Sequence, residues 1–410
     1  EKMRADDATR IKYASKYASV ANYWKKWIGE VEGLKKSNAV QKKATYEQTL
    51  ISKNPDIKIT LDQLTQLYNE QAPYALNNAY YTETIRNAET LALANLFSNY
   101  IAAVESGKMD EKNTVAFKNR LASFYKDYSA ELDAKVTAKL LALYANKTAP
   151  TYLPAGFEKY KNEAQNLQTI ENLSKNSVIT GRSEVNGASL SSDIDKAFSN
   201  PDQLVTAIKK DEMYILFNSL KDTYSKTADK QYTSLQTKID VLQKKFMAQQ
   251  METDKERKFF PDANSTMRVT YGKVKGSSPR DAVSYDFQTH LSGVIEKYVP
   301  GDYEFDVPQK LVDLYNKKDY GIYKDKSGDV PVGFTATNHT TGGNSGSPAL
   351  DAQGNLVGLN FDRQWEGTMS DINYDPRFSR NIMVDTKYIL FVIDKFADSK
   401  WLVDEMKIVK

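Results

Sequence analysis

The sequence predicts an α+β chain in which a large helical region is followed by a smaller β region that ends in a helix. Two observations support this prediction. Apolar residues recur at three- and four-residue spacing through about the first 250 residues, where glycine is sparse. Beyond that point Gly and Pro become frequent, and apolar residues alternate with polar ones as they do on strands. The expected domains are therefore residues 1–253 and residues 254–410.

Three stripes of apolar residues show the helical spacing. They consist of Leu93, Phe97, Tyr100, Ile101 and Val104; of Leu132, Val136, Leu140 and Leu143; and of Leu235, Ile239, Leu242 and Phe246. Proline-containing breaks are expected near residues 54–56, 149–150 and 199–202. The polar segment 181–192 is expected to be a loop.

The β region carries a strand signal, a hairpin signal and a helix signal. Met267, Val269 and Tyr271 alternate with polar residues, which predicts a strand with one buried face. Residues 351–354 read as a tight turn between the apolar segments 348–350 and 355–359, which predicts a β-hairpin. Residues 385–395 are rich in apolar side chains and are expected to form a closing helix.

Composition excludes several classes of function. The 410 residues carry a net charge of +3, so no nucleic-acid partner is expected. The chain has no cysteine and two histidines, so we expect no disulfide, no metal site and no cofactor. No apolar run of about 18 residues occurs, so no membrane span is expected.

The segment 341–350, TGGNSGSPAL, resembles the loop that holds the nucleophile in chymotrypsin-like serine peptidases. Ser345 would be the nucleophile, and the backbone N–H groups of Gly343 and Ser345 would form an oxyanion hole. Asn344 has no charge, so the switch in which an aspartate at this position pairs with a newly cut N-terminus is not expected. The alternative is a Gly/Ser-rich surface loop; the number of fitting positions ahead of a hairpin favours the catalytic interpretation.

A serine nucleophile needs a base, and the chain offers only His290 and His339. His339 lies six residues before Ser345, whereas in the chymotrypsin architecture the base comes from the other barrel. We therefore expect His339 to pack or hydrogen-bond near the site rather than to act as the base. His290 has no catalytic pattern around it and is expected to be structural.

Several segments together resemble the dipeptidyl peptidase 7/11 family of bacterial serine peptidases. They are residues 21–25 (ANYWK), 262–266 (DANST), 334–348 (FTATNHTTGGNSGSP), 358–363 (GLNFDR) and 380–385 (RNIMVD). The resemblance implies a chymotrypsin-like double β-barrel into which a large helical cap is inserted. The catalytic histidine and aspartate of that family precede the helical part. The resemblance therefore implies that this chain is a C-terminal fragment, with the cap and half of the barrel. Its start, which reads as the middle of a helix, agrees with this expectation.

The same resemblance implies roles for the residues that follow the hairpin. Asp362 would hold the free α-ammonium of a peptide, Phe361 would line the site, and Asn22 would assist from the helical cap. Arg363 would offer a two-pronged donor to a carboxylate, which implies Asp or Glu at the residue before the cleaved bond. The alternative for Arg363 is a surface arginine in a salt bridge.

These inferences lead to one function and two alternatives. The expected function is a serine exopeptidase that releases dipeptides from free peptide N-termini and prefers Asp or Glu as the second residue. The isolated chain is expected to be inactive, because its base lies on an N-terminal segment of the same protein. The resemblance also implies a periplasmic or cell-surface location in a Gram-negative bacterium and a homodimer when intact. The alternatives are a non-catalytic peptide-binding protein with a degenerate peptidase domain, and a different serine hydrolase that uses His339.

Overall fold

The computed structural model describes residue 3 and residues 6–261, 264–302 and 304–409. The chain divides into two compact units. The first unit comprises Glu1–Ser15 and Thr49–Phe259, and the second comprises Lys16–Gln48 and Phe260–Lys410. The boundary between these units differs from the single boundary expected between residues 253 and 254, because residues 16–48 pack with the C-terminal part of the chain. Helices α2 (Asp7–Lys36) and α3 (Ala39–Lys53) consequently contribute residues to both units. The mid-helix start expected at the N-terminus falls largely on residues 1–2 and 4–5, outside the described residues.

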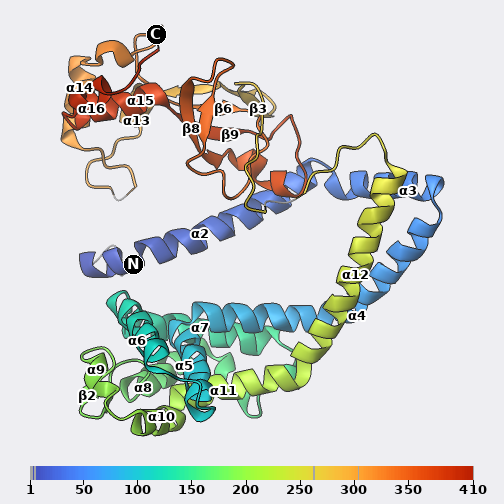
Figure 1. The fold of residues 1–410 in the computed structure, drawn as a ribbon, viewed down its shortest axis with the longest axis vertical. Helices are drawn as coiled ribbons and strands as arrows, with labels where there is room; N and C mark the ends of the chain where they lie inside the picture. Colours follow the sequence, from blue (N-terminus) through green and yellow to red (C-terminus); the bar gives the residue numbers. More distant parts are fainter. Residues whose placement is uncertain (1–2, 4–5, 262–263, 303, 410) are drawn as a thin grey trace. The chain divides into compact units, whose positions relative to one another are not determined.

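The first unit is mainly helical, as the sequence predicts. Within the segment 181–192, expected to be a loop, the short strands β1 (Glu184–Val185) and β2 (Ala188–Ser189) pair antiparallel. The long helices α4 (Asp56–Asn87) and α12 (Lys230–Thr253) run alongside each other (Figure 1). The other α-helices that lie within this unit are α5 (Glu89–Glu105), α6 (Glu111–Lys126), α7 (Ala130–Lys147), α8 (Glu163–Lys175), α9 (Ile194–Ala197), α10 (Pro201–Lys210) and α11 (Glu212–Tyr224). The predicted breaks fall between α3 and α4, just after α7, and at the start of α10. In the part of the chain that the structure describes, no helix is both long and apolar enough to cross a membrane.

Two of the three apolar stripes face the core of the first unit, and the third does not. Phe97 of α5 is fully buried, as expected, and so is Ile239 of α12. In α7, however, Val136 is 37% exposed, whereas Leu141 is fully buried. The buried face of α7 also carries Ala134, Ala138, Ala142 and Ala145. Small side chains allow close helix packing, so the stripe of larger residues indicated the wrong face of a correctly predicted helix.

Helix α5 is capped by a side chain from another helix. Its own N-cap residue, Ala88, has no side chain that can accept a hydrogen bond. Asp133 of α7 instead accepts hydrogen bonds from the backbone N–H groups of Glu89, at 2.7 Å, and Thr90, at 3.1 Å. Burial raises the pKa of Asp133 to about 6 although these hydrogen bonds favour its ionised form. The N-terminus of α5 is thereby fixed to α7.

The second unit is organised around a five-stranded antiparallel sheet. The strands lie in the order β5 (Gln288–His290), β6 (Pro331–Ala336), β9 (Asn381–Asp385), β8 (Leu356–Arg363) and β7 (Pro348–Leu350). β7 and β8 form the predicted hairpin, in which Pro348 pairs with Leu359. β9 leads into α15 (Thr386–Phe391), which confirms the predicted closing helix. Outside this sheet lie the hairpin of β3 (Ser277–Arg280) and β4 (Val283–Tyr285) and the short helices α13 (Leu291–Glu296), α14 (Gln309–Lys317) and α16 (Lys400–Asp404).

The strand predicted around residues 267–271 is not formed. The described residues of this segment are not assigned to any strand, and Met267, Val269 and Tyr271 are 95%, 85% and 91% exposed. The nearest ladder contact is an isolated bridge between Val274 and Ala336 of β6. Alternation produces a strand with one buried face only where a neighbouring strand pairs with it. No such strand is present among the described residues here, so the prediction was wrong.

Helix α2 approaches the segment that follows β8 very closely. That segment is the 3-10 helix η5 (Trp365–Asp371). A Cβ atom on Gly29 would lie 2.2 Å from Oγ1 of Thr368, and one on Gly33 would lie 2.9 Å from Sδ of Met369. A larger residue at either position would force Thr368 or Met369 to shift, and the two glycines lie one helical turn apart on the same face of α2. This close packing places α2 against the end of the sheet that carries residues 361–363.

The buried face of α7 gives a testable prediction. Leu141→Ala should destabilise the first unit by about 2–5 kcal/mol, because it removes a buried side chain and leaves a cavity. Val136→Ala, on the expected but exposed face, should cost about 1 kcal/mol or less. Urea unfolding followed by far-UV circular dichroism measures both. An equal or larger loss in Val136→Ala would show that the packing of α7 described here is wrong.

Candidate active site

The predicted nucleophile lies in a tight turn between β6 and β7. Gly343 and Gly346 have φ values of 100° and 83°, a region that favours glycine. The side chain of Asn344 closes this turn by accepting a hydrogen bond from the backbone N–H of Thr341 at 3.0 Å. The backbone N–H of Asn344 in turn donates to the carbonyl of Thr341 at 3.2 Å. Asn344 thus has a local structural use, and Ser345 is left exposed at the tip.

Asn360 of β8 holds this turn against the sheet. Its carbonyl accepts from the N–H of Gly346 at 2.7 Å, and its own N–H donates to the carbonyl of Ser347 at 2.9 Å. Its side-chain amide donates to the carbonyl of Asn344 at 3.3 Å and accepts from the side chain of Asn381 at 2.8 Å. Asn360 is 7% exposed. Asn360 was given no role from the sequence, although a polar residue directly after the apolar run of residues 356–359 was the available signal.

Ser345 is hydrogen-bonded to the strand that carries the predicted binding residues. Its Oγ donates to the carbonyl of Phe361 at 3.3 Å. Within the described residues, the backbone N–H groups of Gly343 and Ser345 have no acceptor. Two such donors in a turn can stabilise a negatively charged oxygen next to the nucleophile. The arrangement is of the kind that an acyl-transfer site would need, with Ser345 in the position expected for the nucleophile.

Neither histidine is placed to activate Ser345. His339 donates its Nε2–H to the carbonyl of Ser370 at 2.9 Å, and its ring packs 5.0 Å from that of Tyr374, between ring centroids. Nε2 of His290 lies 2.9 Å from a carboxylate oxygen of Asp325. In the described structure, each histidine therefore has a packing or hydrogen-bonding partner and no bond to Ser345.

The predicted binding residues lie at the end of β8 and on α2. β8 has an irregular register between Asn360 and Asp362. Phe361 is 52% exposed, and Asp362 is exposed with its Oδ1 accepting from the N–H of Arg363 at 2.7 Å. Asn22 is exposed on α2, one helical turn before Lys26, and these two residues share a face of the helix.

Arg363 has a carboxylate partner within the chain. Its Nη1 and Nη2 atoms donate to Oδ1 and Oδ2 of Asp371 at 2.8 and 2.9 Å. Nζ of Lys26 lies 3.2 Å from Oδ2 of the same carboxylate, and the side chain of Thr341 also donates to it. The salt-bridge alternative for Arg363 is thus realised here, by Asp371. Asp371, Lys26 and Thr341 had no role predicted from the sequence, since none of them belongs to a recognisable local pattern.

The charge of Asp371 is set by these neighbours. Burial alone would raise its pKa, but hydrogen bonds from Arg363 and Thr341 and the positive charges of Arg363 and Lys26 outweigh burial. The pKa is lowered from 3.8 to about 2. Asp371 is therefore ionised throughout the neutral range. It links β8 and α2 through the charges of Arg363 and Lys26, and the Ser345 turn through the hydroxyl of Thr341.

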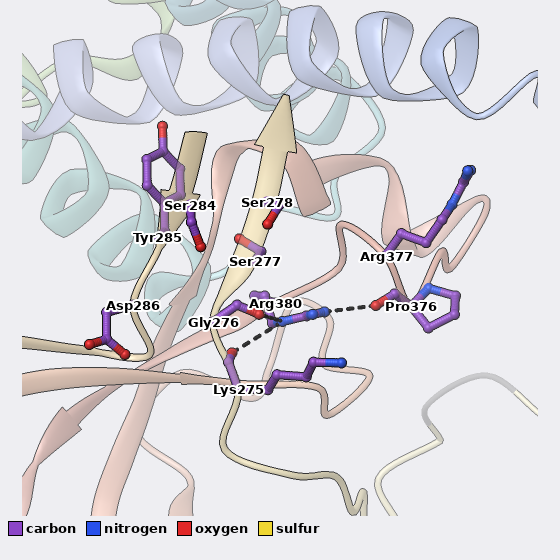
Figure 2. A pocket seen from close by; sticks show the side chains of 10 residues that line it. All are labelled: Lys275, Gly276, Ser277, Ser278, Ser284, Tyr285, Asp286, Pro376, Arg377 and Arg380. Carbon is purple, nitrogen blue, oxygen red and sulfur yellow. Dashed lines mark hydrogen bonds between the residues drawn. The ribbon is translucent and has the colours of Figure 1, made fainter. Parts of the chain in front are cut away.

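A cavity in the second unit lies apart from this loop. It has a volume of about 770 Å³ and is lined by residues of β3, β4 and the turn before β9. Figure 2 shows Arg380 at its wall, where the guanidinium donates to the carbonyls of Gly276 at 2.9 Å and Pro376 at 2.9 Å. Arg380 is 3% exposed and ties these segments together. Among the described residues, no group of three or more His, Asp or Glu side chains is placed to hold a metal ion.

Comparison with known proteins identifies sequence relatives over nearly the whole chain. Residues 1–408 match the family described as Peptidase S46. The chain is 48% identical to the Asp/Glu-specific dipeptidyl-peptidase of Flavobacterium psychrophilum, over 99% of this chain and 56% of that protein. It is 44% identical to the Asp/Glu-specific dipeptidyl-peptidase of Capnocytophaga gingivalis, over 100% of this chain and 57% of that protein. It is 34% identical to dipeptidyl-peptidase 7 of Phocaeicola vulgatus, with similar coverage. The chain thus spans a little over half the length of these relatives.

A solved structure shares the fold. The crystal structure of Porphyromonas endodontalis DPP11 in complex with the dipeptide Arg-Glu matches with a TM-score of 0.81 and 29% sequence identity. The match covers 98% of this chain and 57% of that chain.

The pKa of Asp371 gives a second prediction. Because the folded-state pKa lies below the ordinary value, the pairing contributes stability above about pH 4 and is lost as the pH falls towards 2. A carbon NMR titration of the Asp371 carboxyl should show a midpoint near 2. In Arg363→Met the midpoint should move up towards 3.8. An unchanged midpoint in that variant would contradict the assignment of Arg363 as the main partner.

Proposed function

Because the chain belongs to the peptidase S46 family, we propose that it supplies the nucleophile and the acid-binding pocket of a serine dipeptidyl peptidase. The substrates would be peptides with a free N-terminus and Asp or Glu as the second residue. The observation that supports this most directly is the bond from Ser345 Oγ to the carbonyl of Phe361. Ser345 therefore lies beside the strand end that carries Asp362 and Arg363, which supports a shared role for the three residues.

The nucleophile works together with a base that this chain does not provide. Ser345 would attack the scissile carbonyl, and the N–H groups of Gly343 and Ser345 would hold the oxyanion. His339 and His290 are engaged elsewhere. We therefore assign the base and its aspartate to a further part of a longer protein, consistent with relatives that are nearly twice as long. In that protein the five-stranded sheet would be half of a chymotrypsin-like double barrel, with the first unit as its cap.

The proposed binding residues would account for two features of the released product, its length of two residues and its acidic second residue. Asp362 would accept charge-assisted hydrogen bonds from the α-ammonium of the substrate, with Asn22 and Phe361 beside it. Holding the terminus two residues from the cleaved bond limits the product to a dipeptide. Arg363 would bind the acidic side chain of the second residue through the N–H donors that Asp371 leaves free. An apolar side chain would leave those donors without an acceptor in a closed pocket, which would disfavour apolar substrates. Location in the periplasm or at the cell surface and assembly as a homodimer are further parts of the proposal.

A non-catalytic peptide-binding protein is the second candidate. The observation that favours it is the absence of a suitably placed base among the described residues. It predicts binding of acidic dipeptides with no turnover even in the longer protein, which the following test detects.

Arg363→Gly in the longer protein should reverse the substrate preference. Replacing the guanidinium removes the partner of the substrate carboxylate, so kcat/KM for a Leu-Asp fluorogenic amide should fall at least about tenfold, while that for Leu-Leu amide should rise. Ser345→Ala is the control and should have no activity on either substrate. The specificity proposal fails if Arg363→Gly keeps the acidic preference. The enzymatic proposal fails if the unmodified protein turns over neither amide.

A further inference from the structure

Two basic side chains from distant parts of the sequence meet at one carboxylate beside the nucleophile turn. Arg363 comes from β8, Lys26 comes from α2, and Asp371 ends the segment η5 that packs on α2. The side chains of Arg363 and Asp371 are only 17% and 22% exposed. Such a pair is held more rigidly than an exposed pair, whose side chains move freely in water.

The geometry of the pair leaves Arg363 able to bind a second anion. Asp371 takes one N–H from each Nη atom. A guanidinium has five N–H donors, so further donors remain. In Arg363 these include Nε–H, which has no acceptor within the described residues. A carboxylate on that edge would therefore form its own hydrogen bonds without displacing Asp371.

The charges around the pair are mixed, so binding of a second anion rests on the free N–H donors of Arg363. Arg363 and Lys26 carry two positive charges, and Asp371, Glu30 and Asp362 carry the negative charges near them. Oε1 of Glu30 lies 3.5 Å from Nζ of Lys26, so Glu30 pairs with that lysine rather than with Arg363. Asp362 is the neighbouring residue of Arg363, and its side chain accepts the backbone N–H of Arg363.

We infer that Asp371 is a positioning residue for acidic specificity: it fixes the guanidinium of Arg363 so that the free edge meets the substrate carboxylate, and Lys26 of α2 holds Asp371 in place. This inference rests on the proposed role of Arg363. It makes the preference for Asp and Glu depend on α2, a helix that precedes the peptidase sheet by more than 200 residues. The close packing at Gly29 and Gly33 keeps α2 near enough for Lys26 to reach.

The test compares acidic and apolar substrates in the longer protein. Asp371→Asn keeps the size of the side chain and removes its charge, and Asp371→Glu restores the charge. Lys26→Met removes the second contact, and Lys25→Met is the matched control, an exposed lysine beside it on the same helix. For each variant, kcat and KM are measured with Leu-Asp and Leu-Leu amides. The Kd for the dipeptide Arg-Glu is measured by calorimetry in a Ser345→Ala background, which needs no activity.

The expected result is a loss of selectivity with little loss of catalysis. In Asp371→Asn the ratio of kcat/KM for Leu-Asp to that for Leu-Leu should fall roughly tenfold, mainly through KM, and the Kd for Arg-Glu should rise similarly. Asp371→Glu should recover part of the ratio. Lys26→Met should lower it by a smaller factor, and Lys25→Met should leave it unchanged.

Three results would overturn the inference. An equal fall with both amides would mean that Asp371 only supports the fold. An unchanged ratio would mean that Arg363 needs no positioning partner. A higher ratio would mean that Asp371 competes with the substrate carboxylate. The Arg363→Gly variant separates these failures from a failure of the proposed function. If Arg363→Gly loses the preference for Leu-Asp over Leu-Leu amide, the proposed function still holds. If Arg363→Gly keeps that preference, the proposed function itself has failed.

Discussion

The pairing of the Ser345 turn with strand β8 through Asn360 is the constraint on which the rest of the site depends. Asn360 uses both backbone groups to hold the residues after Ser345, and its side chain ties the turn to β9 through Asn381. The residues that follow Asn360 on the same strand are those to which substrate binding is assigned. A reactive group and its binding groups are best held when they share one rigid element. Here one strand carries the residues proposed to bind substrate and also fixes the turn that holds Ser345, so neither can move far without the other.

Asp371 extends this rigidity from the sheet to helix α2. Partly buried ion pairs add little to the net free energy of unfolding, because desolvation offsets much of their attraction. Their value lies in geometry, since a bidentate carboxylate restricts a guanidinium to one orientation. Asp371 does this for Arg363, while Lys26 and Thr341 fix Asp371 in turn. The lowered pKa of Asp371 follows from the same contacts. In the proposed function, helix α2 would therefore be part of the site as well as a neighbour of it.

Local signals were predictable from the sequence, and long-range contacts were not. The hairpin around residues 351–354 and the helix around Phe97 depend on neighbouring residues, and both are present. The buried face of α7 was misplaced at Val136, and the strand at Val269 was absent, because each depends on what packs against it. Ser345 could be proposed from its loop, and Arg363 from a resemblance. Asp371 could not be found, since nothing near it in the sequence shows that two distant cations meet there.

The most direct test of the account uses the 410-residue chain itself. Its central claim is that Ser345 is a nucleophile whose base lies outside this chain. The isolated chain is incubated with a Leu-Asp chromogenic amide and, separately, with a fluorophosphonate probe, and labelling of Ser345 is followed by mass spectrometry. The longer protein serves as the positive control. The account predicts no turnover and no label in the chain, with both present in the longer protein. Turnover or strong labelling by the chain alone would contradict it and would make His339 the residue to mutate.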